Sequence, residues 1–526
     1  MKRRDFLAAT AALLAPRVSL GASARIEIIP DEPIGVISPT IYGHFTEHLG
    51  GCIYDGIWVG EKSKIPNVGG IRKDIIDHVK AMRAAVIRWP GGCFADSYNW
   101  RDGVGPRDRR PTRTNFWADQ PYMKDAPNGP QKFEPNEFGT NEFNALCRLA
   151  GAQPYLAANV RALTAYDFYE WIEYCNSPAA TTSLANLRAG SGSRDPFNVR
   201  FWGVGNESWG CGGGFTGDEY AIEFRRFTQW VPRYNADLAF IASGPNVADY
   251  AWTHSFFQKL TEKGTSALRR VFGTALHYYC GGAHKGKSTE FTEEGWYELL
   301  SQAVYMETLI HNHWQIMGEV DTTHSVKLVV DEWGAWYETD PSIAPGYLWA
   351  YWPTLRDALI SGMTLDIFNR NAEKVAIANS AQMVNNINSS FIAAADKFAV
   401  TPVYEVFRLY APHQGNTAVR TLFLAPSVGN AKGVQLNGSC SVRETQAVLT
   451  VVNPDARSAS EVEISVRGGR ISNVRASVLT ASDIHAHNTF ENPHAVAPSE
   501  TTVKAGSPLV YQFAPASVTR LMFDLT

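Results

Sequence analysis

The chain has 526 residues, of which 45% are hydrophobic and 19% charged, and its formal net charge at pH 7 is −4. This is the composition of an ordinary globular protein, and the length allows two or three domains. There is no excess of positive charge for binding nucleic acid and no apolar run long enough to cross a bilayer. We therefore expect neither a nucleic-acid partner nor insertion into a membrane.

The first 24 residues have the order of parts found in an export signal. Lys2-Arg3-Arg4-Asp5-Phe6-Leu7 has the form of a twin-arginine start, a short apolar run continues to Leu14, and Ala22-Ser23-Ala24 offers a small-residue cleavage site. Residues 1–24 are therefore predicted to be a twin-arginine-type signal peptide. The protein is then expected to be periplasmic or secreted and to be exported in its folded state. The alternative is an untranslocated N-terminus that holds two arginines by chance.

Residues 39–400 alternate between short β-branched and aromatic runs and amphipathic helical stretches. Eight runs are predicted to be strands: Thr40–Phe45, Ala85–Pro90, Gln153–Asn159, Val199–Gly205, Ala239–Gly244, Phe272–His277, Val326–Asp331 and Thr364–Phe368. The helical stretches are Ile71–Arg83, Asn141–Leu149, Tyr166–Tyr174, Asp218–Tyr234, Trp296–Met317 and Leu348–Leu359. Alternation predicts a parallel sheet, and eight repeats predict a closed (β/α)8 TIM barrel of the α/β class. A doubly wound open sheet is the alternative, but no Gly-x-Gly-x-x-Gly follows the first strand to support a dinucleotide site.

After residue 400 the helical periodicity fades, and short strands separated by turns take over. The predicted strands are Val419–Leu424, Gly433–Leu436, Ala447–Val452, Glu461–Val466, Val474–Leu479, Leu509–Phe513 and Ser517–Leu525. Their spacing predicts a C-terminal antiparallel β-sandwich domain over residues 401–526. Residues 25–38 also contain a strand pattern, and we expect this N-terminal strand to pair with the C-terminal domain.

Two glutamates stand directly after predicted strands. Val204-Gly205-Asn206-Glu207 follows the fourth barrel strand, and Val330-Asp331-Glu332-Trp333 follows the seventh. Active sites of such barrels form at the carboxyl ends of the strands, so both side chains should point into one pocket. Cleavage of a glycosidic bond requires paired carboxyl groups, because one protonates the leaving oxygen while the other attacks the anomeric carbon or activates water. Two solvated surface glutamates are the alternative, but both motifs are flanked by apolar runs.

The cysteine and histidine patterns predict neither a metal site nor a bound cofactor. The seven cysteines include no Cys-x-x-Cys pair, so we expect mostly free thiols, while a single disulfide stays open. His311-Asn312-His313 lies in a helical stretch and His485-Ala486-His487 in a loop. Neither pair has a carboxylate or cysteine partner at ligand spacing.

Four collinear motifs carry a family resemblance. They are Tyr42–Gly50 in the first strand, Arg88–Phe94 with Trp100–Pro106 after the second, Trp202–Glu207 with Trp209–Gly213 around the first glutamate, and Val330–Gly334 around the second. This set resembles the α-L-arabinofuranosidases of glycoside hydrolase family 51, and the resemblance covers nearly all of the chain after residue 24.

The resemblance assigns roles to the matching positions. It implies that Glu207 is the acid/base and Glu332 the nucleophile of a retaining enzyme. The residues implied to bind substrate or to flank the nucleophile are Glu47, Arg88, Asn206, His277, Tyr279 and Gln382. Arg88 would hold Glu332 ionised and oriented through its opposite charge. Cys93 departs from the family pattern, because many members carry a sugar-binding Asn there and a thiol is a weaker donor and acceptor.

The function that the resemblance implies is that of a retaining, exo-acting α-L-arabinofuranosidase. It would release terminal L-arabinofuranose from arabinose-containing plant cell-wall polysaccharides or oligosaccharides, without a cofactor and as a homo-oligomer. Two alternatives stay open: another retaining barrel glycosidase, acting on β-glucan or xylan, and a catalytically silent carbohydrate-binding protein. The presence of both Glu207 and Glu332 argues against the second alternative.

Overall fold

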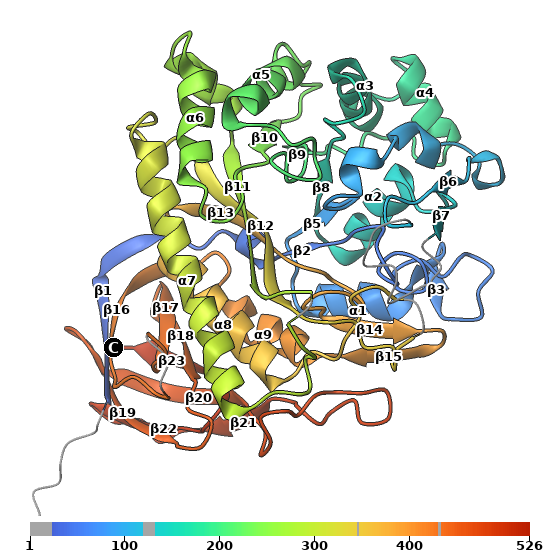
Figure 1. The fold of residues 1–526 in the computed structure, drawn as a ribbon. Coiled ribbons are helices and arrows are strands. Elements are labelled where there is room, and N and C mark those ends of the chain that lie inside the picture. Colours follow the sequence, from blue (N-terminus) through green and yellow to red (C-terminus); the bar gives the residue numbers. More distant parts are fainter. Residues whose placement is uncertain (1–23, 119–131, 284, 345–346, 430–432) are drawn as a thin grey trace, which may run out of the picture.

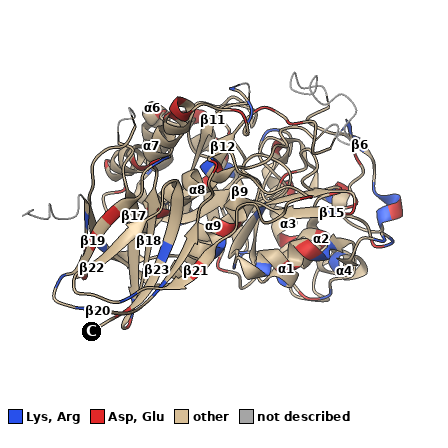
Figure 2. Ribbon diagram, turned by 90° about the horizontal axis from the view of Figure 1, so that it is seen from below, with Lys and Arg blue, Asp and Glu red and all other residues tan. Residues whose placement is uncertain are grey.

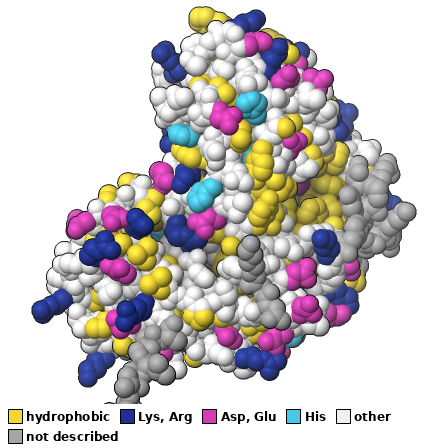
Figure 3. All heavy atoms as spheres, turned by 60° about the vertical axis from the view of Figure 1, so that its left-hand side comes forward, with side chains coloured by type: hydrophobic (Ala, Val, Ile, Leu, Met, Phe, Trp, Pro, Cys, Tyr) yellow, Lys and Arg dark blue, Asp and Glu magenta, His cyan; other side chains and the backbone are white. Residues whose placement is uncertain are grey.

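The computed structural model describes residues 24–118, 132–283, 285–344, 347–429 and 433–526. They form a barrel surrounded by helices and a β-sheet domain that packs beside it (Figure 1). Basic and acidic residues are interspersed along the ribbon (Figure 2). On the face seen in Figure 3, charges of both signs are again mixed, and hydrophobic side chains gather around a hollow.

Eight parallel strands close the barrel in chain order. They are β2 (Gly43–Phe45), β5 (Val86–Trp89), β8 (Gln153–Ala157), β9 (Phe201–Val204), β10 (Ala239–Ala242), β11 (Gly273–Gly281), β12 (Lys327–Trp336) and β13 (Val375–Ser380). β13 pairs with β2 and so closes the ring. Buried side chains from nearly every strand, among them Tyr155, Phe201 and Val329, form a separate core inside the barrel. The predicted (β/α)8 barrel is confirmed.

Helices cover the outside of the barrel. They are α1 (Lys73–Ala81), α2 (Thr140–Ala150), α3 (Ala165–Asn176), α4 (Ser183–Gly190), α5 (Gly217–Thr228), α6 (Tyr250–Thr261), α7 (Glu293–Gly318) and α8 (Leu355–Arg370). Several begin at a threonine whose hydroxyl accepts a backbone N–H of the first turn, as Thr164 does for α3 and Thr216 for α5. Among the described helices, none is long and apolar enough to cross a membrane.

The prediction of the eighth strand is wrong. Thr364–Phe368 lies inside helix α8, and the eighth strand is β13, which follows that helix. Every residue of α8 from Leu355 to Asn369 is buried. A helix that is buried on all sides has no polar face, so a short apolar run within it cannot be told from a buried strand by periodicity.

The second domain is one nine-stranded sheet around a common core. Its strands are β1 (Ala24–Val36), β16 (Thr417–Leu424), β17 (Asn437–Arg443), β18 (Gln446–Asn453), β19 (Ser460–Val466), β20 (Ile471–Leu479), β21 (Ser499–Thr502), β22 (Leu509–Phe513) and β23 (Ser517–Leu525). All neighbours are antiparallel except β1 and β19. Residues from strands near both ends of the sheet, such as Val474 and Phe513, share one core, so the sheet curls over itself. The predicted strand at Gly433–Leu436 is wrong: Leu436 is a buried loop residue that packs into this core, and the strand starts at Asn437.

The N-terminal strand belongs to this second sheet. β1 pairs with β16 along most of its length and with β19 over its first residues. The chain then enters the barrel, passes through α8, and returns through β14 (Phe391–Ala394), β15 (Lys397–Val400) and α9 (Pro402–Tyr410).

A buried carboxyl group joins the barrel to the sheet domain. Asp366 of α8 accepts hydrogen bonds from the hydroxyls of Ser439 (2.6 Å), Thr450 (2.6 Å) and Tyr410 (2.8 Å). Burial raises the pKa of Asp366 to about 7, although these hydrogen bonds act in the opposite direction. The folded protein therefore binds a proton here at pH values where the unfolded chain does not.

This group makes stability depend on pH. Because the pKa of Asp366 is raised on folding, its contribution to stability is most favourable below about pH 4. It declines as pH rises to about 7, by roughly 4 kcal/mol in all. Asp366→Asn mimics the protonated form, so we expect this decline to disappear from the free energy of unfolding in urea. Asp108→Asn, on the exposed surface, is the control. An unchanged pH dependence in the Asp366 variant would contradict the assignment.

Candidate active site

The predicted site residues come together at the carboxyl ends of the barrel strands. Glu47 follows β2, and Arg88 lies in β5. His277 and Tyr279 lie in β11, where His277 pairs with Glu332 of β12. The remaining members, Asn206, Glu207 and Gln382, follow the ends of β9 and β13.

Glu332 is held through both carboxylate oxygens. Oε1 accepts a hydrogen bond from Arg88 Nη1 at 2.9 Å, and Oε2 accepts one from the Tyr279 hydroxyl at 2.8 Å. His277 Nδ1 lies 3.5 Å from Oε2. Only 8% of the Glu332 side chain is exposed. This environment fixes the orientation of the carboxylate and stabilises its charge.

Arg88 contacts several residues of the site at once. Its second nitrogen, Nη2, donates to Asn206 Oδ1 at 2.6 Å, and Nε lies 3.7 Å from Asp331. Burial would lower the pKa of Arg88, but the carboxylates of Asp331 and Glu332 outweigh it and raise that pKa above its usual value. The guanidinium therefore stays charged, and it links Glu332 of β12 to Asn206 in the loop after β9.

Asp331 belongs to the site, although no role was predicted for it. Its carboxylate accepts hydrogen bonds from the Tyr155 hydroxyl (2.6 Å) and from Asn379 Nδ2 (3.0 Å). It also lies 3.7 Å from Arg88 Nε, so the guanidinium has a second acidic neighbour besides Glu332. The only signal in the sequence was its place beside Glu332, which does not reveal where its side chain points.

Glu207 has a different environment from Glu332. Its backbone is in the left-handed region (φ 40°), just after Gly205 (φ 86°), so the chain turns sharply at the end of β9. Oε1 faces His277 Nδ1 at 3.0 Å, and 20% of the side chain is exposed. Burial would lower the pKa of His277, but the charge of Glu332 and the hydrogen bond to Glu207 raise it overall. With 20% of its side chain exposed, against 8% for Glu332, Glu207 is the more accessible of the two carboxyl groups.

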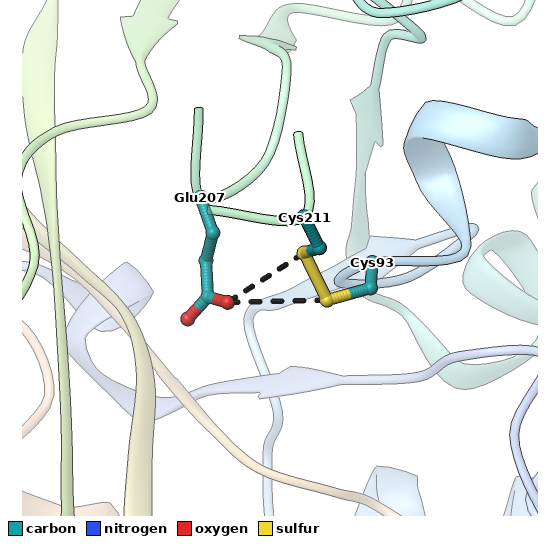
Figure 4. A group of neighbouring side chains, drawn as sticks. All are labelled: Cys93, Glu207 and Cys211. Atoms are coloured by element: carbon teal, nitrogen blue, oxygen red, sulfur yellow. Dashed lines mark hydrogen bonds between the residues drawn. A yellow bond between two sulfur atoms is a disulfide. The ribbon is translucent and has the colours of Figure 1, made fainter. Parts of the chain in front are cut away.

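The other oxygen of Glu207 faces a disulfide between Cys93 and Cys211, two cysteines separated by 118 positions (Figure 4). Oε2 lies 3.7 Å from Cys211 Sγ and 3.9 Å from Cys93 Sγ. Disulfide sulfurs carry no proton, so a hydrogen bond here requires a proton on Oε2. The remaining cysteines, Cys52, Cys147, Cys175, Cys280 and Cys440, are free and buried.

The Asp96 carboxylate fixes the position of the loop that carries Asn206 and Glu207 through hydrogen bonds. Its carboxylate accepts backbone N–H groups of Asn206 (2.9 Å), Val160 (2.7 Å) and Arg161 (3.1 Å). Burial raises the pKa of Asp96 to about 6, so it is ionised above that pH. Nothing in the sequence marked this aspartate, because its partners are backbone groups from distant segments.

Asp96→Asn should therefore damage both stability and activity. In the variant, the side-chain NH2 group would face backbone N–H groups, and two donors cannot hydrogen-bond each other. Losing a hydrogen bond to a charged group costs about 1.5–3 kcal/mol of stability. A shift of Glu207 by about 1 Å can reduce kcat/KM by about 10²-fold. Urea denaturation and steady-state kinetics measure the two effects. Asp108→Asn serves as the control, and full activity in the Asp96 variant would contradict a positioning role.

Glu47 and Gln382 form a buried hydrogen-bonded pair close to Glu332. Glu47 accepts hydrogen bonds from the Phe94 backbone N–H (3.0 Å) and from Gln382 Nε2 (2.9 Å). Burial, together with the charge of Glu332, raises the pKa of Glu47 to about 8. Gln382 Oε1 is buried and has no hydrogen-bond partner among the described residues. A buried acceptor of this kind is suited to a ligand hydroxyl.

Two glycines make room for these carboxyl groups. A Cβ at Gly91 would lie 2.6 Å from Glu47 Cγ, and a Cβ at Gly92 would lie 3.0 Å from Glu332 Oε1. Any larger residue at Gly91 would push Glu47 out of place. The two glycines after β5 are therefore required sterically, because side chains there would collide with the carboxyl groups of the site.

An aromatic cluster borders the site. Trp117 and Trp349 are buried in it, and Trp336, Tyr279 and Cys93 pack against it. Trp58 and Trp100 are buried in the main core. The three tryptophans of the cluster were missed, because Trp117 and Trp349 lie in turns and Trp336 ends β12, where no periodic pattern marks them.

Together, the barrel and the two facing glutamates define a glycoside hydrolase. Known proteins agree. Residues 78–279 match the α-L-arabinofuranosidase 1 domain, and residues 331–517 match the α-L-arabinofuranosidase C-terminal domain. A curated relative, the "Intracellular exo-alpha-L-arabinofuranosidase" of Bacteroides ovatus, is 35% identical over 94% of each chain.

Solved structures show the same likeness. The arabinofuranosidase of Xanthomonas axonopodis pv. citri superposes with a TM-score of 0.87 at 36% identity, covering 95% of this chain and 100% of the other. The α-L-arabinofuranosidase of Thermotoga maritima, solved as an arabinose complex, gives a TM-score of 0.83 at 30% identity with the same coverage. The chain belongs to the α-L-arabinofuranosidases of glycoside hydrolase family 51.

The prediction of export by the twin-arginine route is wrong. The Bacteroides ovatus relative, which matches almost the whole chain, is named as intracellular. A basic pair before a short apolar run is a brief pattern that no folded contact constrains, so it arises easily by chance. Ala24, which the prediction placed in the signal peptide, is buried in β1 and pairs with Val462. Residues 1–23 lie outside the described residues.

Proposed function

We propose that the protein is a retaining, exo-acting α-L-arabinofuranosidase, with Glu332 as the nucleophile and Glu207 as the acid/base. The observation that carries the proposal is the closeness of the two groups, since one oxygen of each carboxyl and His277 Nδ1 lie within 4.8 Å of one another. Retaining glycosidases place their carboxyl groups about 5–5.5 Å apart, whereas inverting enzymes need about 6.5–9.5 Å to admit a water molecule.

In the first step, Glu332 attacks the anomeric carbon of the arabinofuranosyl unit while Glu207 protonates the leaving oxygen. Arg88 and Tyr279 hold Glu332 as the ionised and oriented nucleophile. The bond to the leaving group breaks as an ester to Glu332 forms. His277, beside Glu207 Oε1, keeps the acid aimed at the leaving oxygen.

In the second step, water replaces the leaving group. Glu207, now without its proton, removes a proton from that water, which attacks the anomeric carbon and releases Glu332. Two displacements at one carbon restore the original configuration. The first product formed is therefore the α-anomer of L-arabinofuranose.

Buried polar groups support a site for one terminal sugar. Glu47, Asn206 and Gln382 are each no more than 3% exposed, and all three carry groups able to bind hydroxyls. The partly exposed Trp336 packs against Tyr279 beside them. Aromatic faces suit the apolar side of a sugar ring, so Trp336 would contact the remainder of an arabinose-containing plant cell-wall polysaccharide or oligosaccharide.

A panel of 4-nitrophenyl glycosides tests the substrate class. We expect kcat/KM for the α-L-arabinofuranoside to exceed that for the β-D-xyloside and β-D-glucoside by at least about 10²-fold, since a pocket built to bind specific hydroxyls rejects analogues that leave its polar groups unpaired. Proton NMR at early times should show the α-anomer as the first product. A preference for the xyloside or glucoside would favour the alternative of a β-glucan- or xylan-cleaving enzyme, and binding without turnover would favour a silent carbohydrate-binding protein.

Assembly into a homo-oligomer stays a prediction. Size-exclusion chromatography with light scattering measures it directly. A mass of 58.0 kDa, that of one chain, would contradict it.

A further inference from the structure

The Cys93–Cys211 disulfide has no part in the mechanism above, yet it lies against the proposed acid/base. The two cysteines come from the loops after β5 and β9, and their Cα atoms are 5.6 Å apart. Both are partly accessible, as is Glu207, whereas each of the five free cysteines is buried. The chain therefore places its one accessible cysteine pair in the active site.

The arrangement has the dimensions of a metal centre. Zinc binds thiolate sulfur at about 2.3 Å and carboxylate oxygen at about 2.0–2.2 Å, so a tetrahedral site has sulfur–oxygen edges of about 3.5 Å and a sulfur–sulfur edge of about 3.8 Å. Glu207 Oε2 already lies 3.7 and 3.9 Å from the two sulfurs. Only the sulfur–sulfur separation differs, and breaking the disulfide lets the sulfurs move apart by rotation about their Cα–Cβ bonds.

We propose that, once the disulfide is reduced, Cys93, Cys211 and Glu207 form a binding site for a thiophilic divalent cation of the zinc class. Two soft sulfur ligands and one carboxylate oxygen supply three positions of a tetrahedron, and water completes the fourth. The disulfide form cannot bind in this way, because its sulfurs are bonded to each other.

A second layer of contacts supports this ligand set. Glu207 offers Oε2 to the sulfurs while Oε1 is held by His277 Nδ1 at 3.0 Å. A ligating carboxylate is commonly fixed in this way by a partner on its free oxygen. The sequence alone gave no sign of the site, because its cysteines are 118 positions apart and only the barrel brings them together.

A dithiol supplies the electrons and protons that reduce the Cys93–Cys211 disulfide. Reduction takes two electrons and two protons from the dithiol, which becomes a disulfide, and converts the Cys93–Cys211 bond into two thiols. The cation then displaces the two thiol protons, together with any proton on Glu207, and these protons pass to solvent.

One consequence for activity rests on the proposed function. A Glu207 carboxylate bound to a cation cannot protonate the leaving oxygen, so the metal-bound enzyme should be inactive. The disulfide would thus keep the acid available, and its reduction would make the enzyme sensitive to the cation.

Thiol titration under native conditions tests the first step. Ellman's reagent should detect no accessible thiol in the oxidised enzyme, because the five free cysteines are buried. After treatment with dithiothreitol and its removal by gel filtration, it should detect the two thiols of Cys93 and Cys211. No accessible thiol after this treatment, with unfolding by urea showing that the disulfide is intact, would overturn the proposal.

Cadmium provides the readout for the site, since cadmium–thiolate bonds absorb in the ultraviolet. Titration of the reduced enzyme with Cd²⁺ should give this absorption at one ion per chain, and the oxidised enzyme should give none. Cys211→Ser should weaken binding by at least about tenfold, and Glu207→Gln should do so while leaving the two-thiolate absorption in place. Cys440→Ala, a buried cysteine of the sheet domain, is the matched control and should bind normally.

Activity with Zn²⁺ completes the test. Hydrolysis of an aryl α-L-arabinofuranoside by the reduced enzyme should fall at least about tenfold and return with EDTA, while the oxidised enzyme should be unaffected. Equal inhibition of both forms would place the cation on Glu207, His277 and Glu332 and overturn the proposal. An enzyme that binds Cd²⁺ as expected but hydrolyses no arabinoside would defeat the proposed function alone.

Discussion

Replacing Glu332 with alanine is expected to reduce turnover of every arabinoside by on the order of 10⁴–10⁶-fold, as removal of a catalytic nucleophile does elsewhere. The physical reason is that no ester to the enzyme can form, whatever the leaving group. Arg88 keeps Asp331 as a partner, so the variant should stay folded, which circular dichroism can check. Glu294→Ala, on the exposed side of α7, is the matched control.

Azide then identifies the role of Glu332. In the space left by the missing carboxylate, azide attacks the anomeric carbon directly in a single displacement, so the rescued product should be the inverted β-azide. NMR of the product distinguishes it from the α-azide. A retained α-azide from this variant would mean that the roles of Glu332 and Glu207 are exchanged.

Replacing Glu207 with alanine should have an effect that depends on the leaving group. A natural arabinoside needs protonation of its leaving oxygen, so its kcat/KM should fall by about 10²–10⁴-fold. A dinitrophenyl arabinoside leaves without protonation, so it should still arabinosylate Glu332. Stopped-flow measurement should show a burst of dinitrophenolate, followed by slow breakdown of the intermediate because no base activates water.

Azide also distinguishes this variant. It needs no deprotonation, so it should accelerate breakdown of the intermediate and give the retained α-azide. Glu294→Ala again serves as the control. If Glu207→Ala kept full activity on an arabinoside with a poor leaving group, no acid would be missing and Glu207 would be structural.

The environments of the two glutamates explain why their variants should differ. Glu332 is almost buried, and Arg88 and Tyr279 each donate a hydrogen bond to its carboxylate. Glu207 is more accessible, and it faces His277 and a disulfide rather than an arginine. Two similar carboxyl groups can serve as acid and nucleophile because their surroundings differ.

Local sequence was sufficient for the barrel and for the two glutamates. Seven of the eight barrel strands were located because each is a short buried run between amphipathic helices, a pattern that burial imposes on neighbouring residues. The common pocket for Glu207 and Glu332 followed from one rule, that carboxyl ends of barrel strands meet on one face. The eighth strand was misplaced because α8 is buried on every side, between the barrel and the sheet domain, and therefore lost its helical pattern.

The supporting contacts of the site were decided only by the tertiary structure. Asp96 binds backbone groups of distant loops, Asp331 joins Arg88 to Tyr155 and Asn379, and Cys93 meets Cys211 across 118 positions. Each contact depends on where the closed barrel brings segments that lie far apart along the chain. The sequence by itself placed the two glutamates on one face of the barrel, because side-chain type and the burial pattern of a strand are local properties. The fold determined which groups hold them, because hydrogen bonds and sulfur contacts form only between atoms a few ångströms apart.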